Sequence, residues 1–329
     1  MKAFVSGVSP ERIISLVRVV RQPLRASGRA RTIDFLVNAL TASPLAKGLM
    51  ARAISESGAS LNSGPGAAGT TLAQAEQAGV AFARAKGAKS IADLRALTWQ
   101  KLTAPVPGGA HITHLIVDGW FLPLSTAATY AQGKQNDVAI ITGWNKDEDG
   151  AMPNPTVTAA AFQRQARQRY GASAAEFLKL YPAATDEQAR RSQNESARDR
   201  LKVSTYLWAH LRAQASKTPA WIYFWDHALP GPDAATYGAF HAGEETYVLN
   251  TLYAAPYRPF TDADRKIADQ MSSYWANFIA TGDPNGKGLP LWPAVSDTPE
   301  TMELGDRPKP IALAGSPEKL AFWRKFVMK

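Results

Sequence analysis

Residues 137–152 read DVAIITGWNKDEDGAM, and the two halves of this stretch differ in character. DVAIITGW (137–144) is a short run rich in apolar, β-branched and aromatic residues, which predicts a buried strand. The second half is polar and carries Asp147, Glu148 and Asp149. The stretch therefore predicts a buried strand that ends in an acidic loop.

Two other segments share the strand character of residues 137–144. They are AISESG (53–58) and AWIYFWDH (220–227), and long helical patterns separate all three. One pattern, TTLAQAEQAGVAFARAKG (70–87), starts with threonines able to cap a helix and ends at a glycine. The others are residues 90–102, 158–171, 186–217 and 262–282. Strands separated by long helices pair in parallel, so we expect an α/β sheet with function at the carboxyl ends of its strands.

Composition allows one large domain or two ordinary ones. The chain has 329 residues, of which 45% are hydrophobic, so it can bury a substantial core. Glycine and proline gather at 104–111, 228–238 and 282–293, which we expect to be loops. We find no internal repeat.

A histidine follows the third predicted strand in a distinctive loop. The segment YGAFHAGEETYVL (237–249) contains His241 and, three residues later, Glu244. A carboxylate and a histidine delivered by successive strand ends suit a nucleophile–base–orienter triad, because the acid must fix the imidazole tautomer and stabilise its charge. His227 also lies at a strand end, but it lacks the GAFH context.

Several motifs resemble type B carboxylesterases, the family of the cholinesterases and para-nitrobenzyl esterases. They are, in chain order, ASPLAKGLMARAISESG, IVDGWFLP, GWNKDEDG, GAFHAGEETYVL and SSYWANFIATGDPNGKGLPLWP. The resemblance covers residues 33–329. It implies an α/β-hydrolase fold, a small-molecule carboxylic ester as substrate and a Ser-Glu-His triad in that chain order.

The resemblance assigns roles by motif position. Glu148 is expected to be the triad acid and His241 the general base, with Ser57 and Glu244 as candidates for supporting the pair. Asp149 stands where the family usually has glycine, which adds a charge beside Glu148.

The expected nucleophile is missing. In the family a G-x-S-x-G elbow precedes the helix that reads DFLVNALTA (34–42) here, which would put the serine near Arg31. The sequence contains neither G-x-S-x-G nor an H-G-G oxyanion loop. Ser57 is a poor substitute, because no glycine stands two residues before it. We therefore expect an α/β-hydrolase fold truncated at its N-terminus, with at most trace activity. The alternative is a non-catalytic, cholinesterase-like binding protein.

The first 32 residues differ in composition from the rest. The chain has a net charge of +9, and residues 1–32 hold seven basic residues against the single acid Glu11. We expect residues 1–32 to be a non-family segment, disordered or translated from a wrong frame or start, and residues 33–329 to be a partial hydrolase domain. A basic arm that binds an anionic partner is a weaker alternative.

Other functional classes find little support. No apolar run reaches the roughly 18 residues of a membrane span, and no signal peptide is evident. With no cysteine, the chain has no thiolate nucleophile and no Cys-ligated metal. His111 and His114 in HITH lack a nearby third ligand, and DPNGKG (283–288) lacks the later glutamate of a calcium loop. We expect no cofactor, no metal and no nucleic acid; compartment and oligomeric state stay open.

Overall fold

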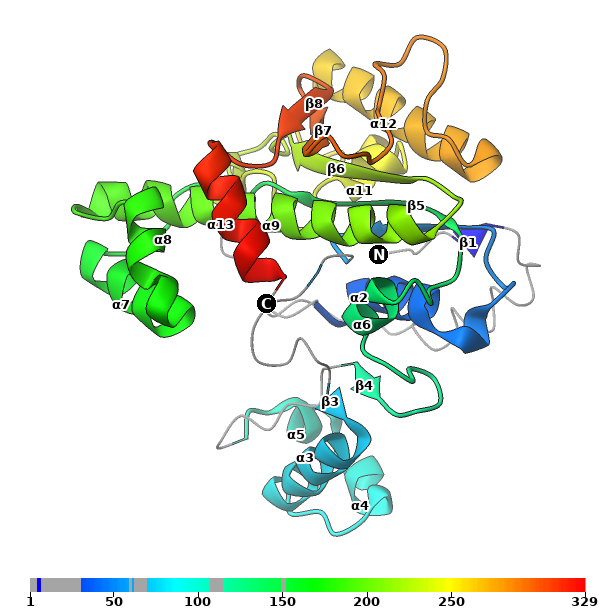
Figure 1. The fold of residues 1–329 in the computed structure, drawn as a ribbon, viewed down its shortest axis with the longest axis vertical. Helices are drawn as coiled ribbons and strands as arrows, with labels where there is room; N and C mark the ends of the chain where they lie inside the picture. The colour runs from blue at the N-terminus through cyan, green and yellow to red at the C-terminus, as the bar shows by residue number, and fades with distance from the viewer. Residues whose placement is uncertain are drawn as a thin grey trace.

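The computed structural model describes residues 5–6, 31–58, 61, 70–106, 115–148 and 152–328. At its centre is a six-stranded sheet in the order β1-β2-β5-β6-β7-β8 (Figure 1). The strands are β1 (Val5–Ser6), β2 (Arg52–Glu56), β5 (Ala139–Asn145), β6 (Ala220–Asp226), β7 (Glu300–Gly305) and β8 (Lys309–Ala312). Strands β2, β5, β6 and β7 run parallel, whereas β1 and β8 are antiparallel to their neighbours. The predicted α/β sheet is confirmed.

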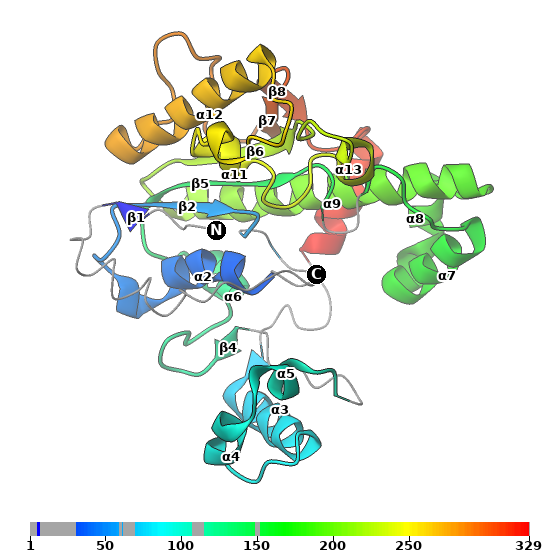
Figure 2. The same ribbon diagram turned by 180° about the vertical axis from the view of Figure 1, so that it is seen from behind.

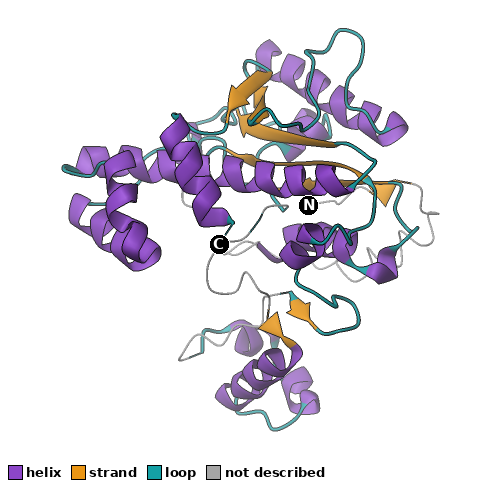
Figure 3. Ribbon diagram, in the orientation of Figure 1, coloured by secondary structure: helices purple, strands orange, loops and turns teal. Residues whose placement is uncertain are grey.

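Alternate side chains of the central strands belong to two separate hydrophobic cores, one on each face of the sheet. Ile140 of β5 and Ile222 of β6 belong to one cluster, and their chain neighbours Ile141 and Trp221 belong to the other. Because successive side chains of a strand point to opposite faces, near-continuous apolar strands require cover on both faces. Helices on the two sides of the sheet provide that cover (Figure 3).

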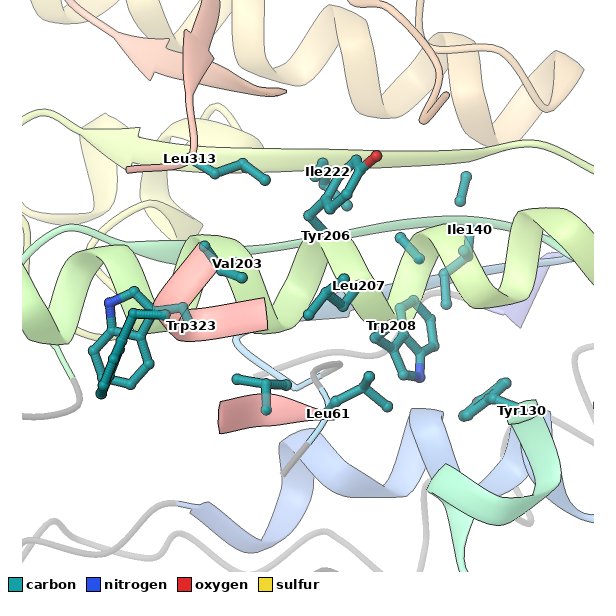
Figure 4. Packing of buried hydrophobic residues seen from close by; sticks show 14 of the residues in the cluster. Leu61, Tyr130, Ile140, Val203, Tyr206, Leu207, Trp208, Ile222, Leu313 and Trp323 are labelled. Atoms are coloured by element: carbon teal, nitrogen blue, oxygen red, sulfur yellow. The ribbon is translucent and has the colours of Figure 1, made fainter. Parts of the chain in front are cut away.

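One face is covered chiefly by a helix of 30 residues, α9 (Asp186–Ala215). Trp208 of α9 meets Tyr130 edge-on, with ring centroids 5.1 Å apart. Figure 4 shows Leu61, Tyr130 and Trp208 packed between α9 and the helices below it. The other helices on this side are α2 (Arg31–Ala42), α6 (Thr126–Ala131), α7 (Ala159–Tyr170), α8 (Ala174–Leu180) and α13 (Pro317–Val327).

The opposite face packs against α11 (Glu245–Val248) and α12 (Asp262–Thr281). Helix α12 begins with a capping box between Thr261 and Asp264 and ends at Gly282, which has a left-handed backbone. Both signals are local and suit a helix of this length. Figure 2 shows α12 and α11 from the side that carries them.

Residues 70–106 and 115–117 form a smaller unit below the main sheet (Figure 1). It contains β3 (Thr70–Thr71), β4 (Ile116–Val117), α3 (Leu72–Ala85), α4 (Ile91–Ala96) and α5 (Trp99–Thr103). The single helix predicted at 90–102 is wrong, because Leu97 is extended and Thr98 caps a second helix. Thr71 caps α3 as predicted.

The structure bears on two more segments, residues 228–238 and residues 1–32. The expected loop at 228–238 contains a short helix, α10 (Ala234–Tyr237). Of residues 1–32, the structure describes β1, which pairs with β2, and the start of α2; the prediction that this segment lies outside the family domain stays a prediction. Among the helices of the described ranges, none combines the length and apolar character needed to cross a bilayer.

Candidate active site

The site lies where the carboxyl ends of the parallel strands meet. Strand β2 ends beside Ser57 and β5 is followed by Glu148. The chain after β6 returns through α10 and places His241 against Glu148. Parallel strands bring their carboxyl ends to one edge of the sheet, so residues 91 and 93 positions apart become neighbours.

Glu148 and His241 form a hydrogen-bonded pair. His241 Nδ1 lies 2.5 Å from Glu148 Oε2. The Glu148 side chain is almost fully buried, whereas that of His241 is 33% exposed. A buried carboxylate on Nδ1 fixes the ring orientation and directs Nε2 away from the acid. The structure thus brings together the two residues that sequence analysis paired.

Ser57 contacts the same carboxylate from the other side. Its hydroxyl donates to Glu148 Oε1 over 2.8 Å, and its backbone N–H donates to the Gly143 carbonyl over 2.8 Å. Ser57 has a left-handed backbone with φ of 55°, a conformation that costs energy in residues other than glycine. Ser57 is buried and directed at the acid, which suits a supporting contact and not a nucleophile.

Asn145 is a site residue that sequence analysis missed. Its backbone N–H donates to Glu148 Oε1 over 2.6 Å, and its side-chain amide donates to the Phe240 carbonyl over 2.7 Å and to Glu244 Oε2. Asn145 therefore joins the acid to the segment that carries His241. Its place as the last residue of a buried strand, inside the NKDE motif, was the available signal.

Glu244 is completely enclosed beside this network. Burial, reinforced by the negative charges of Glu56 and Glu148, raises the pKa of Glu244 well above its ordinary value. The hydroxyl of Tyr223 donates to Glu244 Oε1 over 3.4 Å. Burial also raises the pKa of this tyrosine. The surroundings of Glu244 thus favour its protonated form more than water does.

His227 occupies a different environment. Its Nδ1 lies 2.7 Å from Asp306 Oδ1 and its Nε2 lies 3.0 Å from Asp264 Oδ1. Burial alone would raise the pKa of Asp264, but hydrogen bonds led by those from Thr261 outweigh it and lower the pKa to about 2. His227 thus ties β6 to the start of α12 and belongs to another cluster.

The remaining sequence candidates lie elsewhere. His111, His114 and Asp149 fall outside the described residues. Within the part of the chain that is described, no group of three or more His, Asp or Glu side chains could hold a metal ion. Arg31, near the expected nucleophile position, is the first residue of α2.

Comparison with known proteins gives the family of the chain. The model of the carboxylesterase family matches residues 35–323. The chain belongs to this family. It is 26% identical to cocaine esterase of Homo sapiens over 317 residues, which cover 88% of this chain and 55% of that relative. It is 27% identical to acylcarnitine hydrolase of Mus musculus over 320 residues, 88% of this chain and 55% of the relative.

A third relative matches the chain over a similar share of its length. Phenmedipham hydrolase of Pseudarthrobacter oxydans is 26% identical over 299 residues, which cover 84% of this chain and 58% of the relative. The chain thus spans about half the length of these curated relatives. The motifs that carry Glu148 and His241 lie within the family match.

Proposed function

We propose that this chain supplies the acid–base half of a carboxylic-ester hydrolase, with Glu148 as the orienting acid and His241 as the general base. The 2.5 Å contact between His241 Nδ1 and Glu148 Oε2 carries the proposal. A carboxylate on Nδ1 sets the tautomer in which Nε2 accepts a proton, and it stabilises the imidazolium that results. Membership of the carboxylesterase family supports the reaction class.

The proposed reaction is acyl transfer on a small-molecule ester. A serine hydroxyl attacks the ester carbonyl, His241 takes the hydroxyl proton, and the imidazolium then protonates the leaving alcohol. Water attacks the acyl-enzyme with His241 again as base. Backbone N–H groups would stabilise the oxyanion. Ser57 and Asn145 hold the acid in place through their hydrogen bonds to Glu148 Oε1.

The serine of this reaction is not provided by a G-x-S-x-G motif in this sequence. Ser57 does not fit the role, because its hydroxyl proton is directed to Glu148 and its side chain is buried. A nucleophile needs its proton held by the base. We therefore propose that the chain by itself hydrolyses esters at no more than a trace rate.

The activity of the isolated chain tests this point. Hydrolysis of para-nitrophenyl butyrate should be the same for the parent chain, His241→Ala and His227→Ala, because the base has no activated hydroxyl to serve. The rates are measured by absorbance at matched concentration after gel filtration. The proposal would be contradicted if the parent chain hydrolysed the ester, His241→Ala did not, and His227→Ala did so at the parent rate.

A hybrid chain tests the function itself. Residues 35–323 are joined to the portion of phenmedipham hydrolase that lies outside its match to this chain, which would supply the nucleophile. A folded hybrid should hydrolyse para-nitrophenyl esters, and His241→Ala should lower kcat on the order of 10³-fold or more, because the base is lost. Circular dichroism and gel filtration confirm equal folding of the two hybrids. Equal rates with and without His241 would refute the assignment.

A further inference from the structure

Asp147 has two contacts with the backbone of Ala239. They join the loop that carries Glu148, called the acid loop, to the loop that carries His241, called the histidine loop. Its backbone N–H donates to the Ala239 carbonyl over 3.0 Å, and its Oδ2 accepts the Ala239 N–H over 2.8 Å. Asp147 directly precedes Glu148, and Ala239 lies two residues before His241. The bridge therefore links the two loops immediately beside the pair that they carry.

The second carboxylate oxygen of Asp147 is anchored to α9. Arg198 Nη2 donates to Asp147 Oδ1 over 2.6 Å, and Arg198 Nε donates to the Lys146 carbonyl over 3.2 Å. The Asp147 side chain is 7% exposed and the Arg198 side chain 24% exposed. Removing either partner of such an enclosed pair leaves the other charge poorly compensated.

The two loops approach closely at Gly238 and Asp147. Gly238 has a φ of 59°, and a Cβ placed on it would lie 2.2 Å from Asp147 Oδ2. The Asp147 carboxylate thus lies where a side chain at position 238 would collide with it, so this position requires glycine. Few alternative positions for Asp147 would keep both of its contacts to Ala239.

We infer that Asp147 is a positioning residue, which sets the distance between Glu148 and His241 by tying their loops together, with Arg198 as its anchor. The inference rests on the proposed function, because it assigns Asp147 a part in aligning the proposed acid and base. Catalytic geometry tolerates displacements of only about 0.5 Å, and a short hydrogen bond is equally sensitive. Loss of the bridge lets the loops move independently.

The His241 Nδ1 proton gives a readout that is independent of catalysis. A short hydrogen bond to a carboxylate moves this proton far downfield in the ¹H NMR spectrum. The full-length chain is labelled with ¹⁵N-histidine, and the signal is assigned by its loss in His241→Gln. We expect Asp147→Ala and Arg198→Met to lose the signal, and Arg198→Lys, which keeps the charge, to retain it.

A neighbouring salt bridge provides the matched control. Lys146, which directly precedes Asp147, donates from its Nζ to Asp226 Oδ1 over 2.7 Å. This salt bridge does not join the two loops. Asp226→Ala removes a salt bridge next to Asp147 and should keep the downfield proton. If Asp147→Ala does not fold, Arg198→Met decides the question.

The outcomes separate the two claims. A signal present in the parent chain and intact in folded Asp147→Ala, or in Arg198→Met where Asp147→Ala fails to fold, overturns the positioning role and leaves the proposed function standing. A parent spectrum identical to that of His241→Gln means that the pair does not form. That result would overturn the proposed function and the positioning role together.

Discussion

Single residues at the end of β5 determine how the acid is held. Glu148 accepts three hydrogen bonds, from the Ser57 hydroxyl, the Asn145 backbone and the His241 ring. A carboxylate that receives several donors is kept in one orientation. Ser57 and Asn145 thus hold Glu148 Oε1, and Glu148 Oε2 is left to orient His241, the proposed base.

Glu244 gives a residue-scale prediction about pH. Because burial raises its pKa, the folded chain holds the Glu244 proton at pH values where the unfolded chain releases it. The associated stability is complete below the carboxyl's unfolded pKa and falls as the pH rises through the folded pKa. Glu244→Gln keeps the shape and removes the titration. Its unfolding free energy relative to the parent should therefore rise with pH, by about 1.4 kcal/mol for each pKa unit.

Urea denaturation between pH 4 and pH 9 measures this effect. Glu187→Gln is the control, because Glu187 is an exposed carboxylate at the start of α9. It gives the change in unfolding free energy that follows from removing a surface charge. A difference between Glu244→Gln and the parent that stays constant across the pH range would show that Glu244 does not titrate as inferred.

Among the elements, those with strong local signals were predictable from sequence. The apolar runs of β2, β5 and β6 and the threonine caps of α3, α9 and α12 depend on neighbouring residues alone. Strands β7 and β8 were missed, because Glu300 and Glu303 break the apolar character of β7 and β8 begins with Lys309 and Pro310. Their pairing with the sheet, and not their own composition, makes them strands.

Helix α12 carries the element-scale prediction. Asp264 Oδ2 accepts the backbone N–H and the hydroxyl of Thr261, and its Oδ1 accepts the Tyr247 hydroxyl over 2.7 Å. Asp264→Ala removes the carboxylate half of the capping box and leaves partly buried donors without an acceptor. We expect a loss of about 2–4 kcal/mol in unfolding free energy, measured by urea denaturation at pH 7.

The control for this change lies in the same helical turn. Asp262 is exposed and pairs with Arg265, so Asp262→Ala should cost less than about 1 kcal/mol. Since the pKa of Asp264 is lowered to about 2, its contribution is present above the unfolded pKa near 4 and disappears as the pH falls toward 2. Equal losses for the two variants would contradict this account of the helix start.

At the scale of the whole molecule, sequence reasoning could predict that strand ends converge, and hence that Glu148 and His241 meet. It could not predict the bridge from Asp147 to Ala239 or the anchor at Arg198, which join residues 92 and 51 positions apart. No local pattern encodes such pairs, because they depend on how α9 packs beside the acid loop. His227 shows the converse, since its place at a strand end does not bring it to Glu148.

The hybrid with phenmedipham hydrolase gives the most direct test of the account, through its kcat/KM before and after Glu148→Gln. The amide keeps the size of the side chain but cannot hold the imidazole in the proton-accepting tautomer. The account predicts a fall on the order of 10³ to 10⁴-fold in a hybrid that remains folded. A kcat/KM unchanged by Glu148→Gln would contradict the claim that this carboxylate orients the base.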